Sequence, residues 1–247
     1  RRSQRHGGHG SRLGSMWRRA PAGMVFGTDF SGGRLLSPDG KPVTLEGSAS
    51  INAADNYMAT TGAVTDQGTV ADSSDLSFTD GAGTDRAFSV SCWVYLTALP
   101  SAGNRAGVIK KGTKQGSTTW EYDCWAQFQD TTIGPALAIR HSNAAASLLR
   151  YSPPLSAGQW YHLAFLYDGG EVIGGLKIYQ GGVRVDATSG GAGAYTGMSD
   201  TATPLNLGTS SLGGTNPSLN GRTDDIRIFN YELTAAQVLR IFNEGRQ

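Results

Sequence analysis

The sequence is poor in the features that identify many common protein classes. Among its 247 residues no run of 18 apolar residues occurs, and no charged-then-apolar leader of the secretory type is present, so neither a membrane span nor a signal peptide is predicted. Only four histidines and two cysteines are present. The HExxH, GxSxG and phosphate-loop motifs are missing, which argues against the corresponding zinc peptidases, serine hydrolases and nucleotidases.

Glycine is abundant instead, and it lies between short apolar stretches. The 35 Gly and 9 Pro, together with 17% charged residues, favour many short strands joined by tight turns. The expected strands lie near 25–30, 43–46, 68–71, 87–97, 106–110, 119–129, 135–141, 147–151, 159–167, 174–180, 183–187, 204–208 and 222–230. We therefore predict an all-β fold, a two-sheet antiparallel β-sandwich formed by residues 25–247.

One short helix is predicted at the C-terminal end of the sequence. Thr234 and Gln237 have the spacing of a capping box, Leu233 and Val238 that of a hydrophobic staple, and Gly245 stands where a helix would stop. We expect this helix to cover the sandwich as a structural element.

The two cysteines, Cys92 and Cys124, both fall on predicted strands. Alternation places Cys92 on one face with Phe88, Val90 and Val94, so both thiols are expected to point into the core. Buried free cysteines are favoured, and a disulfide between neighbouring strands is the alternative.

Residues 1–24 form a basic arm with a composition unlike that of the rest. The first 28 residues hold six Arg and no acid, whereas residues 29–247 hold fifteen Lys and Arg against 20 acids. Such a segment does not fold by itself. A solvated linker, a nucleic-acid contact and docking on a larger protein assembly are the alternatives, and the lack of interleaved aromatics disfavours nucleic acid. For docking, the expected anchoring residues are Arg12, Met16, Trp17, Arg18 and Arg19.

Several motifs in the last third of the sequence follow one another in a characteristic order. They are Gln159-Trp160-Tyr161-His162-Leu163-Ala164, Leu176-Lys177-Ile178-Tyr179-Gln180-Gly181-Gly182, Leu205-Asn206-Leu207-Gly208 and Asn220-Gly221-Arg222-Thr223-Asp224-Asp225-Ile226-Arg227-Ile228-Phe229-Asn230. Upstream, Phe88-Ser89-Val90-Ser91-Cys92-Trp93-Val94 and Gly107-Val108-Ile109-Lys110-Lys111-Gly112 continue the pattern. Over roughly residues 25–245 the chain resembles the laminin-G-like, concanavalin A-like jelly-roll family. The resemblance implies a fold that mostly binds and only sometimes catalyses.

The resemblance also defines what catalysis would require. Glucanases of this superfamily carry ExDxxE on one strand, and the nearest match here begins at Glu121 and Asp123 but has Ala126 in place of the third carboxylate. Hydrolysis with retention needs two carboxyl groups about 5–5.5 Å apart. We therefore predict no catalytic activity, with a degenerate glycoside hydrolase or lyase as the alternative. His162, on a strand with two apolar faces, is expected to be a core residue.

Two predicted strands offer side chains that suit a sugar. Sugars bind where an aromatic platform lies beside planar polar groups. By alternation, the outward residues expected to bind a glycan are Trp93, Tyr95, Glu121, Asp123, Trp125 and Gln127, with Arg140 from a neighbouring strand. The alternative is that Trp93 and Trp125 are covered by loops or by a partner.

A structural Ca²⁺ is implied by the resemblance. In the family, a carboxylate at the position of Asp224 and oxygens from the first strand hold this ion, and Gly27 and Asp29 lie in the matching region. Calcium takes six to eight oxygen ligands. The alternative is that Asp224 and Asp225 cap a turn or pair with Arg222 or Arg227.

These observations favour a non-enzymatic recognition or decoration module of a larger assembly, anchored by its N-terminal arm and capable of glycan binding. A viral or phage particle is the first expectation for that assembly. An extracellular or cell-surface carbohydrate-binding adhesion domain is the second. The expected location is accordingly the virion or the outside of a cell.

Overall fold

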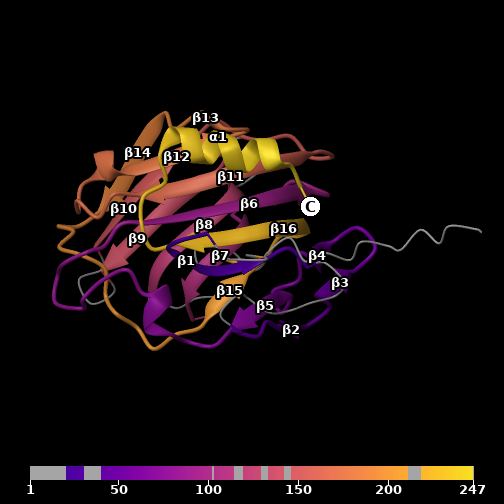
Figure 1. The fold of residues 1–247 in the computed structure, drawn as a ribbon, viewed down its shortest axis with the longest axis horizontal. Helices are drawn as coiled ribbons and strands as arrows, with labels where there is room; N and C mark the ends of the chain where they lie inside the picture. The colour runs from indigo at the N-terminus through magenta and orange to yellow at the C-terminus, as the bar shows by residue number, and fades with distance from the viewer. Residues whose placement is uncertain are drawn as a thin grey trace, which may run out of the picture.

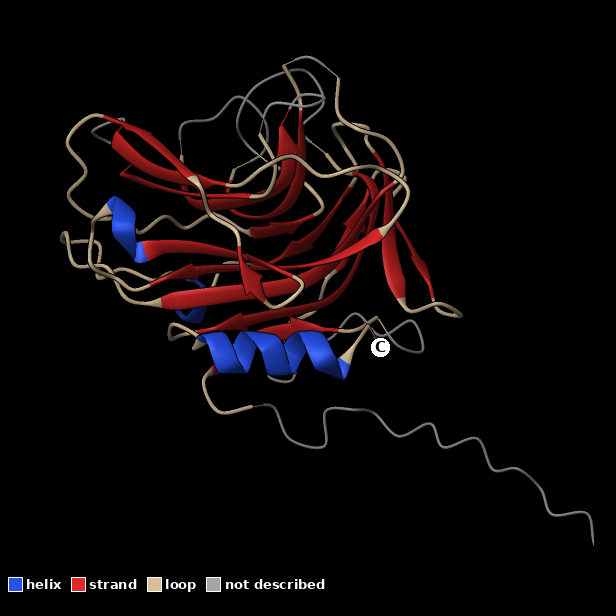
Figure 2. Cartoon of the chain, turned by 90° about the horizontal axis from the view of Figure 1, so that it is seen from above, coloured by secondary structure: helices blue, strands red, loops and turns tan. Residues whose placement is uncertain are grey.

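The computed structural model describes residues 21–30, 40–101, 103–113, 119–128, 133–141, 146–210 and 218–246. Two antiparallel sheets pack face to face, and one helix lies against the outside of one of them (Figures 1 and 2). The all-β sandwich predicted from the sequence is thus confirmed.

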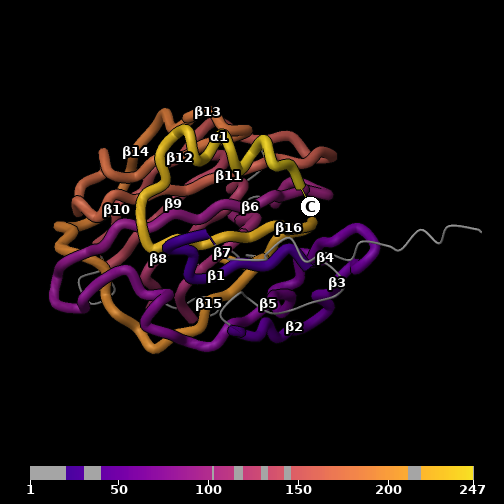
Figure 3. The backbone as a smooth tube through the Cα atoms, viewed as in Figure 1, coloured from indigo at the N-terminus to yellow at the C-terminus, as the bar shows by residue number. Residues whose placement is uncertain are grey.

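The sheet that carries the helix, here the helix-side sheet, has the strand order β13-β12-β11-β6-β16-β4-β3, with β1 also paired to β16. Its strands are β1 (Met24–Thr28), β3 (Ser50–Asn52), β4 (Tyr57–Thr61), β6 (Phe88–Leu96), β11 (Trp160–Tyr167), β12 (Leu176–Gln180), β13 (Val183–Arg184) and β16 (Asn220–Phe229). The first and last strands of the described chain lie side by side, as the indigo and yellow tubes of Figure 3 show.

The other sheet, here the second sheet, has the order β14-β10-β9-β8-β7-β15-β5-β2. Its strands are β2 (Thr44–Glu46), β5 (Gln67–Val70), β7 (Arg105–Gly112), β8 (Trp120–Phe128), β9 (Ala136–His141), β10 (Ala146–Tyr151), β14 (Thr188–Ala192) and β15 (Leu205–Leu207). Two short 3₁₀ turns, Ser74–Leu76 and Ile173–Gly175, lie in connections. The sequence reasoning missed β3, β4 and β14, because these strands are short or, in β14, contain glycine without apolar alternation.

The core between the sheets follows the alternation of the strands. On β6, Phe88, Val90, Cys92, Val94 and Leu96 are all buried in one apolar cluster. Tyr122, Cys124 and Ala126 face them from β8. Cys92 and Cys124 are free and buried, which confirms their prediction as small core residues.

Helix α1 (Ala235–Glu244) begins where the capping box predicts. The Thr234 hydroxyl accepts a bond from the Gln237 backbone N–H at 3.2 Å, and the Gln237 side chain accepts one from the Thr234 N–H at 2.8 Å. Val238 and Ile241 pack with Leu233 against the outside of the helix-side sheet. Gly245 ends the helix with a φ of 76°, a left-handed conformation that glycine adopts without strain.

A buried ion pair holds two loops over the outer side of the second sheet. The Lys111 ammonium lies 3.3 Å from Glu121 and 2.6 Å from Asp72, and it donates to the carbonyls of Thr201 at 3.0 Å and Thr203 at 2.6 Å. Glu121 also accepts bonds from the Thr201 N–H at 3.0 Å and hydroxyl at 2.8 Å. Burial raises the pKa of Glu121, and Lys111 and Thr201 oppose the rise. This network fastens the loop segments around residues 72 and 199–203 to β7 and β8.

A second polar network lies at a bulge in β16, where the pairing with β6 shifts between Asp224 and Arg227. Asp225 has a φ of 46°, and its carboxylate accepts two bonds from Arg227, at 2.8 and 2.7 Å. Arg227 also donates to Glu244 at 2.7 Å and so ties β16 to the helix. The buried Asp224 carboxyl accepts from the Asp225 N–H at 2.7 Å and from Arg246 at 3.2 Å. Burial raises the pKa of Asp224 to about 8.

Replacing Lys111 by Met should destabilise the fold strongly. The change leaves the Glu121 carboxylate buried without its cation, a loss that costs about 3–5 kcal/mol. Urea unfolding would measure this free energy. Lys177→Met is the matched control, because Lys177 pairs with Glu232 at the surface and should lose no more than about 1 kcal/mol. Equal losses in the two variants would contradict the role assigned to the buried pair.

Replacing Asp224 by Asn should flatten the dependence of stability on pH. The pKa of Asp224 is higher in the folded protein than its usual value of 3.8, so the folded state keeps a proton that the unfolded state has released. This group therefore makes its full contribution to the free energy of unfolding below about pH 4. The contribution falls as the pH rises towards 8, by up to about 1.4 kcal/mol per pH unit. Urea unfolding at pH 5 and pH 8 would compare the variants. An unchanged pH slope in Asp224→Asn would show that this carboxyl does not carry it.

Candidate functional site

The residues predicted to bind a glycan lie on two opposite sides of the molecule. Trp93 and Tyr95 belong to β6 of the helix-side sheet, whereas the predicted residues of β8 and Arg140 of β9 belong to the second sheet. Because the outer faces of a sandwich point in opposite directions, these residues do not form one site. The sequence-based grouping is corrected here.

The outward residues of β8 are not exposed, contrary to expectation. Glu121, Asp123 and Gln127 are fully buried and Trp125 is 1% exposed. Loop segments cover them: Asp123 accepts a bond from the Ser210 hydroxyl at 2.7 Å, and Gln127 accepts one from the Leu155 N–H at 2.9 Å. Period-two alternation identified the correct face of β8 but could not show that loops pack on it.

Cations accompany the two carboxylates of β8. Glu121 is paired with Lys111, and the charge of Asp123 acts on Lys110 and Arg105. Burial lowers the pKa of Lys110 to about 8, and Asp123 opposes this shift. In this environment neither carboxylate meets solvent, and the side chain of Ala126 points to the opposite side, into the core between the sheets.

Arg140 lies half-buried next to an aromatic cluster on the second sheet. Its guanidinium is 5.4 Å from the centre of the Trp120 ring, and Trp120 packs in one cluster with Trp125. Arg105 covers the other indole, with its guanidinium carbon 4.8 Å from the ring of Trp125. The stacked cations explain how two indoles are accommodated outside the core. Ligand binding by these residues stays a prediction.

Trp93 lies beneath the helix. Its ring is 5.8 Å from that of Phe242 on α1 and 5.4 Å from that of His162. His162 is buried, and its Nε2 is 2.9 Å from the Ser91 hydroxyl. Burial, reinforced by the nearby positive charge of Arg227, lowers the pKa of His162 to about 4. His162 is thus the core residue that the sequence predicted, and Trp93 contributes to packing under the helix.

Tyr95 lies farther along the same face and belongs to a partly exposed cluster, here called the outer-face row: Tyr57, Tyr95, Trp160 and Arg222. Trp160 of β11 is paired with Tyr95 of β6, which is paired with Arg222 of β16. Tyr57 comes from β4, the next strand of the sheet. Four adjacent strands thus each contribute one side chain.

The rings of the outer-face row lie close together. The ring centre of Trp160 is 5.6 Å from that of Tyr95 and 6.2 Å from that of Tyr57. The Arg222 guanidinium is 4.8 Å from each tyrosine ring. Beyond the end of α1, Arg246 reaches to within 4.4 Å of the Trp160 ring and donates to the Asp55 carbonyl at 2.8 Å. The helix therefore stops short of the row and leaves an aromatic and cationic surface.

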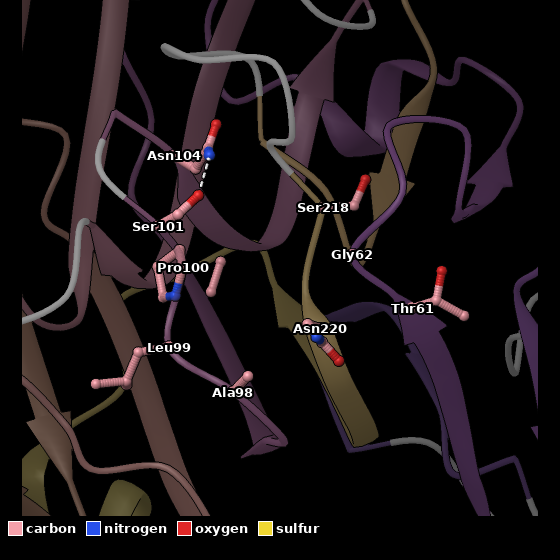
Figure 4. A pocket seen from close by; sticks show the side chains of 10 residues that line it. Thr61, Gly62, Ala98, Leu99, Pro100, Ser101, Asn104, Ser218 and Asn220 are labelled. Atoms are coloured by element: carbon pink, nitrogen blue, oxygen red, sulfur yellow. Dashed lines mark hydrogen bonds between the residues drawn. The ribbon is translucent and has the colours of Figure 1, made fainter.

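A polar pocket of about 240 Å³, here the rim pocket, opens next to the row at the end of β4 and the beginning of β16 (Figure 4). It is lined by Thr61, Gly62, Ala98, Leu99, Pro100, Ser101, Asn104, Ala106, Ser218 and Asn220. Asn220 is two residues from Arg222 on β16, so alternation places both side chains on the same face, about 7 Å apart. The pocket therefore extends the surface of the outer-face row.

Of these residues, only Tyr95 was predicted as a ligand contact. Tyr57 was missed because β4 was missed, and Trp160 and Arg222 were noted only as parts of the family motifs. The available signal was Trp160 at the very start of its strand, where a large indole next to a turn is commonly only partly covered. The register of strand pairing brings the four residues together, and this register could not be predicted from the sequence.

The candidate metal residues Gly27, Asp29 and Asp224 have other neighbours in the described structure. Gly27 is paired with Arg227, and the charge of Asp29 acts on Asp225 rather than on Asp224. Asp224 meets Arg246 instead. The described residues contain no group of three His, Cys, Asp or Glu that could hold a metal ion. Calcium binding at Asp224 stays a prediction.

The predicted anchoring residues Arg12, Met16, Trp17, Arg18 and Arg19 lie outside the described residues. The described chain begins at Pro21, whose carbonyl accepts a bond from the Met24 N–H at 3.0 Å, and the Gly23 carbonyl accepts one from Asn230. No helix in the described ranges has the length and hydropathy needed to cross a membrane.

Solved structures with the same fold include binding domains of larger proteins. The binding domain of Paraclostridial Mosquitocidal Protein 1 superposes with a TM-score of 0.67 at 13% identity, covering 90% of this chain and 52% of that one. The botulinum neurotoxin serotype G binding domain superposes with a TM-score of 0.66 at 14% identity. The match covers 90% of this chain and 51% of that one. This chain thus spans about half the length of those two chains.

A third similar structure is domain 4 of AbnA, a GH43 extracellular arabinanase from Geobacillus stearothermophilus, in complex with arabinotriose. Its TM-score is 0.59 at 19% identity, and the match covers 88% of this chain and 97% of that domain. No curated protein sequence matches significantly. The family model of the concanavalin A-like lectin/glucanases superfamily matches residues 66–239, well over half of the sequence. With this match and a two-sheet antiparallel sandwich, the chain belongs to the concanavalin A-like lectin/glucanase superfamily.

Proposed function

We propose that this chain is a non-catalytic carbohydrate-binding module that holds a glycan against the outer-face row. The observation that carries the proposal is the set of three partly exposed rings, Tyr57, Tyr95 and Trp160, next to a polar pocket. The ring centre of Trp160 lies 6.2 Å from that of Tyr57 and 5.6 Å from that of Tyr95. A sugar presents an apolar C–H face to an aromatic ring and hydroxyls to polar groups, so this surface offers both kinds of contact.

The rim pocket supplies the polar part of the proposed contact. Amides, hydroxyls and backbone groups line it, and Asn104 donates to Ser101 at 2.7 Å within it. Its volume is below the roughly 300–1,000 Å³ of sites for drug-sized ligands. It therefore suits a single sugar residue, while further residues of an oligosaccharide extend over the row.

The burial of Glu121 and Asp123 supports a binding function rather than hydrolysis. Both carboxyl groups are covered by loops, and Glu121 is held by Lys111 and Thr201. General acid catalysis requires direct or single-water contact with the substrate. The fold similarity to toxin binding domains and to an arabinanase domain bound to arabinotriose also agrees with binding.

We further propose that the module belongs to the surface of a larger assembly, a viral or phage particle, where the basic arm of residues 1–24 attaches it. The charge contrast between this arm and the rest of the sequence supports attachment through the arm. An adhesion domain outside a cell is the second candidate, favoured by the similarity to a domain of an extracellular arabinanase.

Replacing Trp160 or Tyr95 by Ala should weaken glycan binding at least tenfold, because loss of an anchoring aromatic costs about 2 kcal/mol or more. An array of oligosaccharides that includes arabinotriose would identify ligands, and calorimetry would measure their affinities. Tyr151→Ala is the matched control, since Tyr151 is a partly exposed aromatic on the second sheet. If Tyr151→Ala abolishes binding and the other two variants do not, the glycan site lies on the second sheet.

A chain that begins at Pro21 should keep the unfolding midpoint of the full chain, because the first strand starts at Met24 and its contacts remain. The same truncation should prevent co-sedimentation with the assembled particles. Thermal unfolding and co-sedimentation would measure the two effects separately. Full incorporation of the shortened chain would show that the arm does not attach the module.

A further inference from the structure

Arg222 is held in an unusual position for an arginine on the outside of a sheet. Its guanidinium carbon lies 4.8 Å from the ring centres of both Tyr57 and Tyr95, so both rings lie within cation–π distance of it. Stacking of this kind orders the guanidinium plane and lowers the entropy lost when a ligand binds. A guanidinium carries its N–H groups at the edge of its plane, so a ring stacked on the plane leaves them available as donors.

These N–H groups have no acid partner in the described structure. Arg150, Arg184 and Arg227 each pair with a carboxylate at 2.7–2.8 Å. Arg222, in contrast, forms neither a hydrogen bond nor an ion pair with any residue of the described ranges. A partly exposed guanidinium without an acid partner among the described residues is thus available at the surface.

The acids closest to the row are already engaged. The Asp55 carboxylate accepts a bond from the Asn52 amide at 3.0 Å, and the same amide donates to the Tyr57 hydroxyl at 3.0 Å. Asp224 meets Arg246 at 3.2 Å and is buried. Since Arg246 also lies over Trp160, the surface of the row carries two guanidinium groups. Of the two, Arg222 has no acid partner among the described residues, and a cation of this kind attracts an anionic ligand.

From this geometry we infer that the glycan bound by the row is acidic, and that Arg222 binds a sugar carboxylate through two parallel N–H bonds. This inference rests on the proposed carbohydrate-binding function and specifies its ligand class: oligosaccharides that contain a uronic acid or another carboxylated sugar. The planar fork of arginine matches a carboxylate in two bonds, and charge-assisted bonds of this type are stronger than neutral ones. The neighbouring aromatic rings contact the apolar face of the sugar, while the Arg222 guanidinium binds its carboxylate.

The test uses a glycan array on which each acidic oligosaccharide stands beside its carboxyl-reduced form and a sulfated form, with affinities then measured by calorimetry. The full-length protein should prefer the carboxylated form by about tenfold or more. Arg222→Gln should lose this preference, so that the carboxylated and the reduced forms bind with equal affinity. Arg222→Lys keeps the charge without the fork and should lose most of the preference. Arg240→Gln, which removes an exposed arginine of α1, is the matched control and should change nothing.

The outcomes separate the two proposals. Equal binding of carboxylated and reduced forms, lost in Trp160→Ala, would overturn the acidic ligand and keep the carbohydrate-binding module. Preference for the sulfated form would overturn the assignment of a carboxylate. If Arg222→Lys keeps the full preference for the carboxylated form, the proposed pair of N–H bonds to the carboxylate is refuted. Absence of binding to every form on the array would overturn both the ligand class and the proposed function.

Discussion

The buried pair of Lys111 and Glu121 determines which side of this sandwich is open to a ligand. Ionised groups are costly to bury, and this pair is accommodated because each partner is surrounded by further bonds. Those bonds come from the loop residues Thr201, Thr203 and Asp72. The requirement to satisfy the pair therefore holds these loops against β7 and β8. The carboxylates that resemble a glucanase motif consequently serve the structure and are removed from solvent.

The opposite face is divided by the helix. α1 crosses the helix-side sheet and covers its apolar surface with Val238 and Ile241, while Phe242 lies over Trp93. The helix does not extend over Tyr95, which follows Trp93 by two residues on β6. Tyr95 and its cross-strand neighbours are therefore partly exposed. The end of the helix thus marks the boundary between the packed part of this face and its partly exposed part. Arg227 and Glu244 fix that boundary because they tie the last turn of the helix to β16.

The sequence allowed prediction of what depends on local pattern. Alternation along β6 correctly placed Cys92 in the core, and the Thr234 and Gln237 spacing located the start of the helix. Exposure on β8 was predicted wrongly, because alternation assigns a side chain to a face but does not show which loops cover that face. The outer-face row could not be assembled from the sequence. Tyr57, Tyr95, Trp160 and Arg222 are far apart in the chain, and only the pairing register makes them neighbours.

The position of β16 has a consequence for synthesis of the chain. This strand is the last of the described strands in the sequence, yet it lies between β4 and β6 and also pairs with β1. Until residue 229 emerges, the facing edges of β4 and β6 therefore have unpaired backbone groups, and such edges can pair with other chains. Closure of the helix-side sheet is thus a late, long-range step that folds slowly. Nascent chains that are released before residue 229 is made would expose these edges to pairing with other chains.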